Sequence, residues 1–170
     1  MRKCGVFILA GGIAVNKELF KLPVLTLMSG VMLQIADYIT ALILVRDASE
    51  WTLEMGTIAF CIQLLLSVAL FIVIGIIVRK LYDRKNIAKS ATLLVIYSIV
   101  VLALEQITQY FGTYNMIVHF LYFPVYIFTV ITHVLARISS AESINWLYVI
   151  PSLFAPYLFV LFSKKSPNEN

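Results

Sequence analysis

Two acidic side chains interrupt long apolar stretches of the chain and could form a site inside a membrane. They are Asp37 and Glu105. A charged group in a hydrocarbon core costs at least about 2.5–3.5 kcal/mol on insertion scales, so it usually faces the interior of a helix bundle or a cavity. Two further polar residues, Gln63 and His119, interrupt neighbouring apolar stretches. If successive stretches cross the membrane in alternating directions, all four side chains lie in the same half of the bilayer. The pattern predicts a common intramembrane polar site, with interhelical packing bonds as the alternative.

A second set of polar residues recurs at spacings of three and four, which places it on one face of a helix. Continuing from His119, its members are Tyr122, Tyr126, Thr129 and His133. We expect this face to contact other helices, and we expect Phe128 and Val130 to lie nearer the lipid. Pro124 lies within the same stretch and frees a backbone carbonyl about one turn earlier, which another polar group must satisfy.

These residues could support only a few kinds of chemistry. The chain has no zinc-peptidase, nucleophile-elbow or phosphate-loop motif. Asp37 has no second acid three or four residues away, so no metal site is predicted. His119 and His133 could bind haem only if a second copy supplied two more histidines, so no cofactor is predicted. An acid–base pair of Glu105 and His119 is geometrically possible, but nothing selects it. We predict no catalytic residue and favour a protein that is not an enzyme.

The elements that must position these residues are apolar helices. Of the 170 residues, 61% are apolar and only 13% are charged, whereas soluble domains are about 25% charged. Several apolar stretches exceed the roughly 18 residues that a bilayer core demands. The sequence therefore predicts an all-α integral membrane protein, a single bundle over residues 1–163 with a polar tail at 164–170. The five predicted transmembrane helices are at about 22–45, 56–78, 90–111, 116–136 and 144–162.

The first 15 residues allow three interpretations. Arg2 and Lys3 precede an apolar stretch that resembles a signal peptide. A short interfacial or partly inserted helix is our preferred prediction, and a sixth transmembrane helix is the main alternative. Cleavage as a signal peptide is disfavoured because it would reverse the orientation that the later charges predict.

Charges between the apolar stretches predict the orientation. Residues 79–89 hold five basic residues and one acid, a net charge of +4, and residues 46–54 hold one basic residue and three acids, a net charge of −2. Basic loops stay in the cytoplasm, so we expect 79–89 inside and 46–54 and 112–115 outside. Five crossings then place Lys164 and Lys165 outside, against the same rule.

The function is predicted only as a class. We expect a multi-pass protein of the cell membrane, most simply a non-enzymatic subunit or assembly factor of a membrane complex. A small-solute or proton-linked transporter is the alternative, and an intramembrane enzyme ranks third. The expected partners are the lipid bilayer and either another membrane protein or a second copy of the chain. The basic residues lie between apolar stretches and do not indicate nucleic acid.

Overall fold

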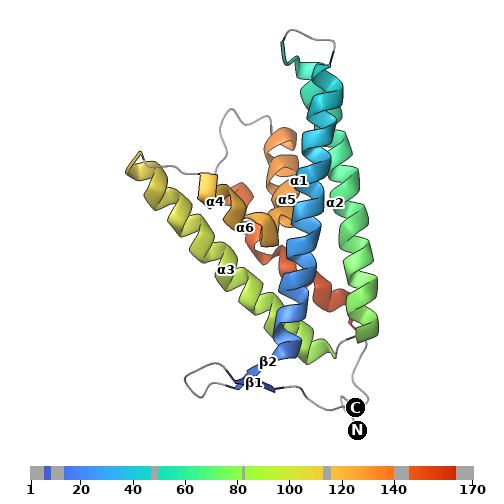
Figure 1. Ribbon diagram of the computed structural model, residues 1–170, viewed down its shortest axis with the longest axis vertical. Helices are drawn as coiled ribbons and strands as arrows, with labels where there is room; N and C mark the ends of the chain where they lie inside the picture. Colours follow the sequence, from blue (N-terminus) through green and yellow to red (C-terminus); the bar gives the residue numbers. More distant parts are fainter. Residues whose placement is uncertain are drawn as a thin grey trace.

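Three long helices form the frame of the bundle. The computed structural model describes residues 6–8, 14–46, 50–81, 83–112, 116–139 and 146–163. After the one-turn 3-10 helix η1 (Lys17–Phe20), α1 (Lys21–Val45) and α2 (Leu53–Leu81) run antiparallel, and α3 (Arg84–Tyr110) diverges from them along its length (Figure 1). We call the end where α1 stops and α2 starts the acidic end, and the end where α2 stops and α3 starts the basic end.

The helical membrane class predicted from the composition is confirmed. Four helical stretches are long and apolar enough to cross a bilayer: Lys21–Val45, Leu53–Lys80, Arg84–Tyr110 and Val118–Ile138. A fifth apolar stretch, Leu147–Phe162, is shorter. The five predicted ranges each fall on one of these stretches.

The outer surface of the bundle is apolar. On α1 alone, Met28, Ile35 and Ile43 are 60%, 54% and 68% exposed. Contiguous apolar surface on this scale is not stable in water, but it matches the acyl chains of a bilayer. The chain is therefore an integral membrane protein.

The N-terminal segment is not the helix that we expected. Strand β1 (Val6–Ile8) pairs antiparallel with β2 (Ala14–Asn16), with Phe7 opposite Val15. β-branched and aromatic residues favour this extended pairing. The predictions of an interfacial helix and of a sixth transmembrane helix are wrong for these strands. Predictions for residues 1–5, 9–13, 47–49, 82, 113–115, 144–145 and 164–170 lie outside the described residues.

The segment after α3 folds back on itself halfway through the bundle. It consists of α4 (Met116–Leu121), the 3-10 turn η2 (Phe123–Val125) and α5 (Tyr126–Ile138). Pro124 has no backbone N–H and breaks the helix at η2, and the Tyr97 hydroxyl donates to the Leu121 carbonyl over 2.7 Å. The bend packs against Gly30 of α1. A Cβ placed on Gly30 would lie 1.8 Å from the Phe123 carbonyl oxygen. Only glycine permits this close approach of two backbones.

The depths of these contacts show that the bend lies deep in the bundle and that α5 ends toward the acidic end. Gly30 is fifteen residues from Val45, so the bend lies about 22 Å below the acidic end of α1. The Arg137 side chain, near the end of α5, contacts the Gly56 carbonyl in the first turn of α2, with a nitrogen–oxygen distance of 3.4 Å. In Figure 1, α5 correspondingly rises back toward the acidic end.

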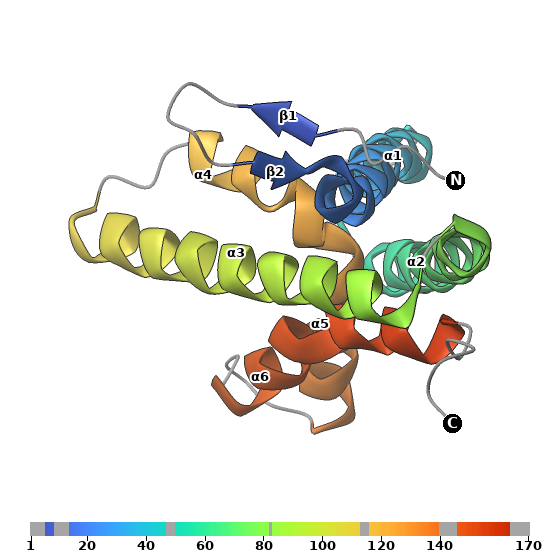
Figure 2. The same ribbon diagram turned by 90° about the horizontal axis from the view of Figure 1, so that it is seen from below.

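The last helical stretch then runs toward the basic end. It comprises α6 (Trp146–Phe154) and the 3-10 helix η3 (Ala155–Phe162). Along η3, Tyr157 shares a 2.9 Å hydrogen bond with Thr92, eight residues into α3. Phe162 packs edge-on against Phe71 of α2, with ring centroids 5.6 Å apart. Figure 2, seen from below, places α5 and α6 on the opposite side of α3 from α4 and the two strands.

The buried core lies where the folded-back segment meets the helices around it. Phe128 of α5 is 2% exposed and packs against Phe159 of η3, with ring centroids 5.9 Å apart. Val130 is 6% exposed. The prediction that Phe128 and Val130 face lipid is therefore wrong, because other helices enclose α5 on these faces as well as on its polar face.

Candidate functional site

Three predicted residues from three helices meet at one phenol oxygen. Tyr126, the first residue of α5, donates its hydroxyl proton to Asp37 Oδ2 of α1 over 2.8 Å. The same oxygen accepts from Gln63 Nε2 of α2 over 3.1 Å. The fold-back creates this cluster, because it brings Tyr126 up from the bend between the two helices. All three side chains are half-buried.

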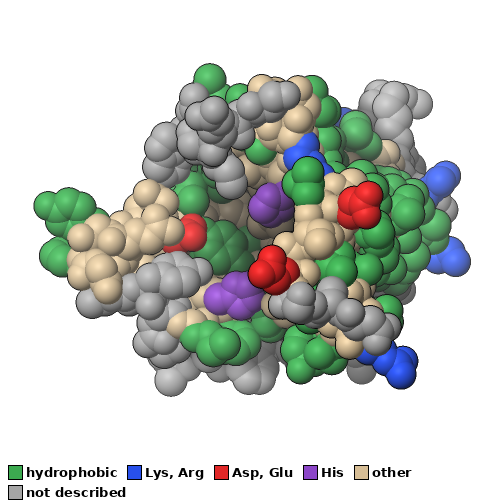
Figure 3. All heavy atoms as spheres, turned by 90° about the horizontal axis from the view of Figure 1, so that it is seen from above, with side chains coloured by type: hydrophobic (Ala, Val, Ile, Leu, Met, Phe, Trp, Pro, Cys, Tyr) green, Lys and Arg blue, Asp and Glu red, His purple; other side chains and the backbone are tan. Residues whose placement is uncertain are grey.

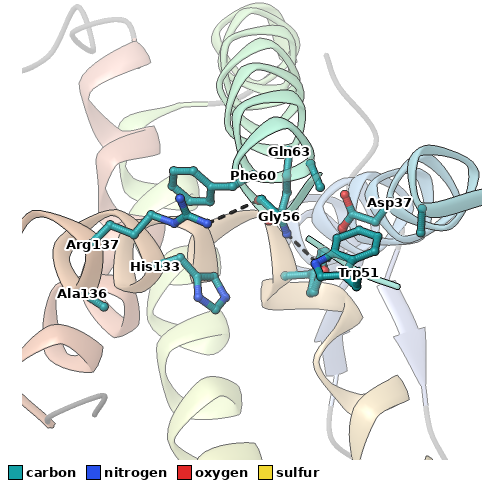
Figure 4. A pocket seen from close by; sticks show the side chains of 11 residues that line it. Asp37, Trp51, Gly56, Phe60, Gln63, His133, Ala136 and Arg137 are labelled. Atoms are coloured by element: carbon teal, nitrogen blue, oxygen red, sulfur yellow. Dashed lines mark hydrogen bonds between the residues drawn. The ribbon is translucent and has the colours of Figure 1, made fainter. Parts of the chain in front are cut away.

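This cluster lines a cavity of about 590 Å³ that is open on one side. Toward the acidic end the same cavity is lined by Trp51, Phe60 and Arg137 (Figure 4). The Arg137 guanidinium lies over the Phe60 ring, 4.1 Å from its centroid, so its charge has a cation–π partner. Asp37 lies eight residues before the end of α1 at Val45, and Gln63 lies ten residues after the start of α2 at Leu53. The two residues therefore form the floor of the cavity, roughly 12–15 Å below the acidic end.

The acidic end of the molecule is hollowed. Figure 3 shows histidine and acidic side chains and a basic side chain around this hollow, with apolar side chains farther out. Polar groups in the interior and apolar groups outside are the arrangement expected of a bundle with a water-filled interior. The bundle is therefore open at this end and lined there by polar side chains.

A second cavity, of about 530 Å³, lies between α3, the folded-back segment and α6. Glu105 accepts hydrogen bonds from the Tyr122 hydroxyl and, over 3.2 Å, from Gln109 Nε2. His119 and Thr129 also line this cavity. Tyr126 and His133 line both cavities, so these two side chains stand between them.

The structure thus divides the eight predicted site residues between two adjoining groups. Asp37 and Gln63 join Tyr126 in the first cavity, whereas Glu105 and His119 join Tyr122 and Thr129 in the second. His133 belongs to both, and Tyr126 also lines the second cavity. Within the described residues, Asp37 and Glu105 share no hydrogen bond. Each is bound to its own tyrosine, and these two tyrosines lie four residues apart on either side of the η2 break.

No family model, curated protein or solved structure matches this chain.

Sequence reasoning missed the residues at the mouth of the first cavity. Trp51 and Arg137 lie at the ends of predicted membrane segments, where an aromatic ring and a cation are ordinary interfacial anchors. Only the fold-back brings them to the same opening. Within the described residues, no three His, Cys, Asp or Glu side chains are grouped as metal ligands. The cavities offer carboxylates, amides, hydroxyls and one guanidinium, which suit the binding of a polar solute.

Proposed function

We propose that the protein is a multi-pass carrier or channel that admits a small polar solute into the bundle from the acidic end. The observation that carries this proposal is the Asp37–Tyr126–Gln63 cluster at the floor of the 590 Å³ cavity. The cavity lies within the 300–1,000 Å³ range of small-molecule sites, and its convergent polar groups can orient a ligand.

The broken helix supports this class of function. Non-helical backbone at membrane depth is tolerated where it is buried in protein or lines a water-filled cavity. Transporters often form their solute sites from discontinuous helices near the middle of the bilayer. Here Tyr126 directly follows the η2 turn, so the interruption and the binding group are adjacent in the chain. A role as a subunit or assembly factor needs no cavity and stays a prediction.

We further propose that the acidic end faces away from the cytoplasm in the cell membrane. Four crossings and a re-entrant segment then replace the five crossings expected from sequence. The basic residues 79–89 lie inside, and Lys164 and Lys165, which follow Ser163 directly, return to the same side. This arrangement removes the one violation of the charge rule that five crossings required.

Binding measurements on matched variants test the function. The protein would be purified in mild detergent and its melting temperature measured against amines, amino acids, sugars and carboxylates. We expect at least one class to raise the melting temperature of the unmodified protein, because a ligand stabilises the state that it binds. Asp37→Asn should abolish that increase, and Glu105→Gln, in the second cavity, should retain it. Absence of any ligand response, or equal responses in both variants, would contradict the proposal.

A further inference from the structure

Two buried polar atoms near the cavity floor have no hydrogen-bond partner among the described residues. They are Oε1 of Gln34 on α1 and Oγ of Ser67 on α2. Ser67 is only 2% exposed. Buried polar groups in native proteins are nearly always paired, and an unpaired one calls for an ordered water or ion.

Both atoms belong to residues one turn deeper than the floor. Gln34 precedes Asp37 by three residues, and Ser67 follows Gln63 by four. Because α1 and α2 run in opposite directions, both shifts point toward the basic end, by about 4.5 Å and 6 Å. Residues three or four apart share a helical face, so Gln34 and Ser67 extend the faces that carry the floor residues.

Other buried hydroxyls in the bundle behave differently from that of Ser67. Ser98 donates to the Leu94 carbonyl over 2.9 Å, and Ser29 donates to the Thr26 carbonyl over 2.7 Å. Bonding back to the preceding turn is the usual way in which a serine inside a helix is satisfied. The Ser67 hydroxyl makes no such bond, so it remains available to another molecule.

We propose that ordered water occupies the bundle beneath Tyr126 and bonds to Gln34 and Ser67. A buried water makes about three hydrogen bonds, and these two atoms supply two partners on adjacent helices. The inference rests on the proposed function and deepens it: hydration does not end at the Asp37–Tyr126–Gln63 floor but reaches about one helical turn farther toward the basic end.

Cysteine reactivity in membranes tests whether water reaches this depth. In a background with Cys4→Ser and Cys61→Ser, single variants Gln63→Cys, Ser67→Cys and Leu65→Cys would be treated with a small methanethiosulfonate reagent. Only the thiolate reacts, so the rate reports contact with water. Leu65 is the matched control, because it lies on the same helix between the two sites and is 71% exposed on the apolar surface. We expect Gln63→Cys and Ser67→Cys to react about tenfold faster than Leu65→Cys or more.

The outcomes separate the two proposals. If Gln63→Cys reacts and Ser67→Cys is as slow as Leu65→Cys, the path ends at the floor and the hydrated extension is wrong, while the proposed function stands. If Gln63→Cys is also slow, the cavity itself is not hydrated and both proposals fail. Ser67→Ala gives a second readout. Loss of a water partner should lower the melting temperature, whereas removal of a truly unpaired hydroxyl would raise it and overturn the inference.

Discussion

Tyr126 is the residue on which the first cavity depends. Its hydroxyl is at once the donor to Asp37 and the acceptor from Gln63, so one oxygen joins α5 to α1 and α2. Tyr122, four residues earlier and before the η2 break, makes the equivalent bond to Glu105 on α3. Two carboxyl–phenol pairs therefore attach the folded-back segment to α1 and α3, and the Gln63 amide adds α2.

Double-mutant cycles can show that these pairs are separate. We expect Tyr126→Phe to destabilise the protein by roughly 0.6–1.7 kcal/mol, the range measured for hydrogen bonds between membrane helices. Its effect should be less than additive with Asp37→Asn, since both act on the same bond. Tyr122→Phe combined with Asp37→Asn should add within about 0.5 kcal/mol. Unfolding titrations in mixed micelles measure the free energies of the unmodified protein, the three single variants and the two double variants. Strong coupling between Tyr122 and Asp37 would instead indicate one common site.

At the scale of the element, the decisive feature is the contact between Gly30 and the η2 turn. The Phe123 carbonyl approaches the α1 backbone so closely that a methyl group at position 30 would displace main-chain atoms rather than a side chain. Moving η2 moves Tyr126, which follows it directly. Gly30 thereby determines the position of Tyr126, a cavity residue far from it in the sequence.

Gly30→Ala should destabilise the protein by about 1–3 kcal/mol or more, as overpacking does, and should also abolish the ligand response. Gly56→Ala is the matched control. A Cβ there meets only the Trp51 indole nitrogen at 3.3 Å, a side chain that can shift. We expect that control to unfold at nearly the same denaturant concentration as the unmodified protein. A Gly30→Ala protein with unchanged stability and binding would show that the bend does not depend on this contact.

The sequence predicted the helices better than the path that they follow. Apolar runs located α1, α2 and α3, because length and hydropathy are properties of the chain alone. Pro124 likewise indicated a break in the helix. The carbonyl of Leu121, just before the break, accepts a hydrogen bond from the Tyr97 hydroxyl. The direction of the chain after the break could not be predicted, because it depends on Gly30, ninety-odd residues earlier in the chain. The same tertiary contact explains why Phe128 is buried and why the predicted polar residues divide into two groups.

At the scale of the whole molecule, the proposed topology has four full crossings, an even number, because the folded-back segment enters and leaves on the same side. A single cysteine at Ser139, just after α5, should therefore react with an impermeant thiol reagent added to intact cells, as one at Glu50 should. Cysteines at Asn86 and Ser163 should react only after the cells are lysed. The background again carries Cys4→Ser and Cys61→Ser. Five straight crossings predict the opposite result for Ser139 and Ser163, so these two positions decide between the topologies.

The bend at η2 also has a consequence for the order of assembly. A turn of interrupted helix cannot stand alone in hydrocarbon, because its unpaired carbonyl groups need partners that lipid does not offer. The bend contacts Gly30 on α1 and the Tyr97 hydroxyl on α3, and both of these residues precede the bend in the chain. A ribosome makes those helices first. The helices that contact the bend are thus made before the bend itself. α6 and η3 are made after it, and Phe159 of η3 then packs against Phe128.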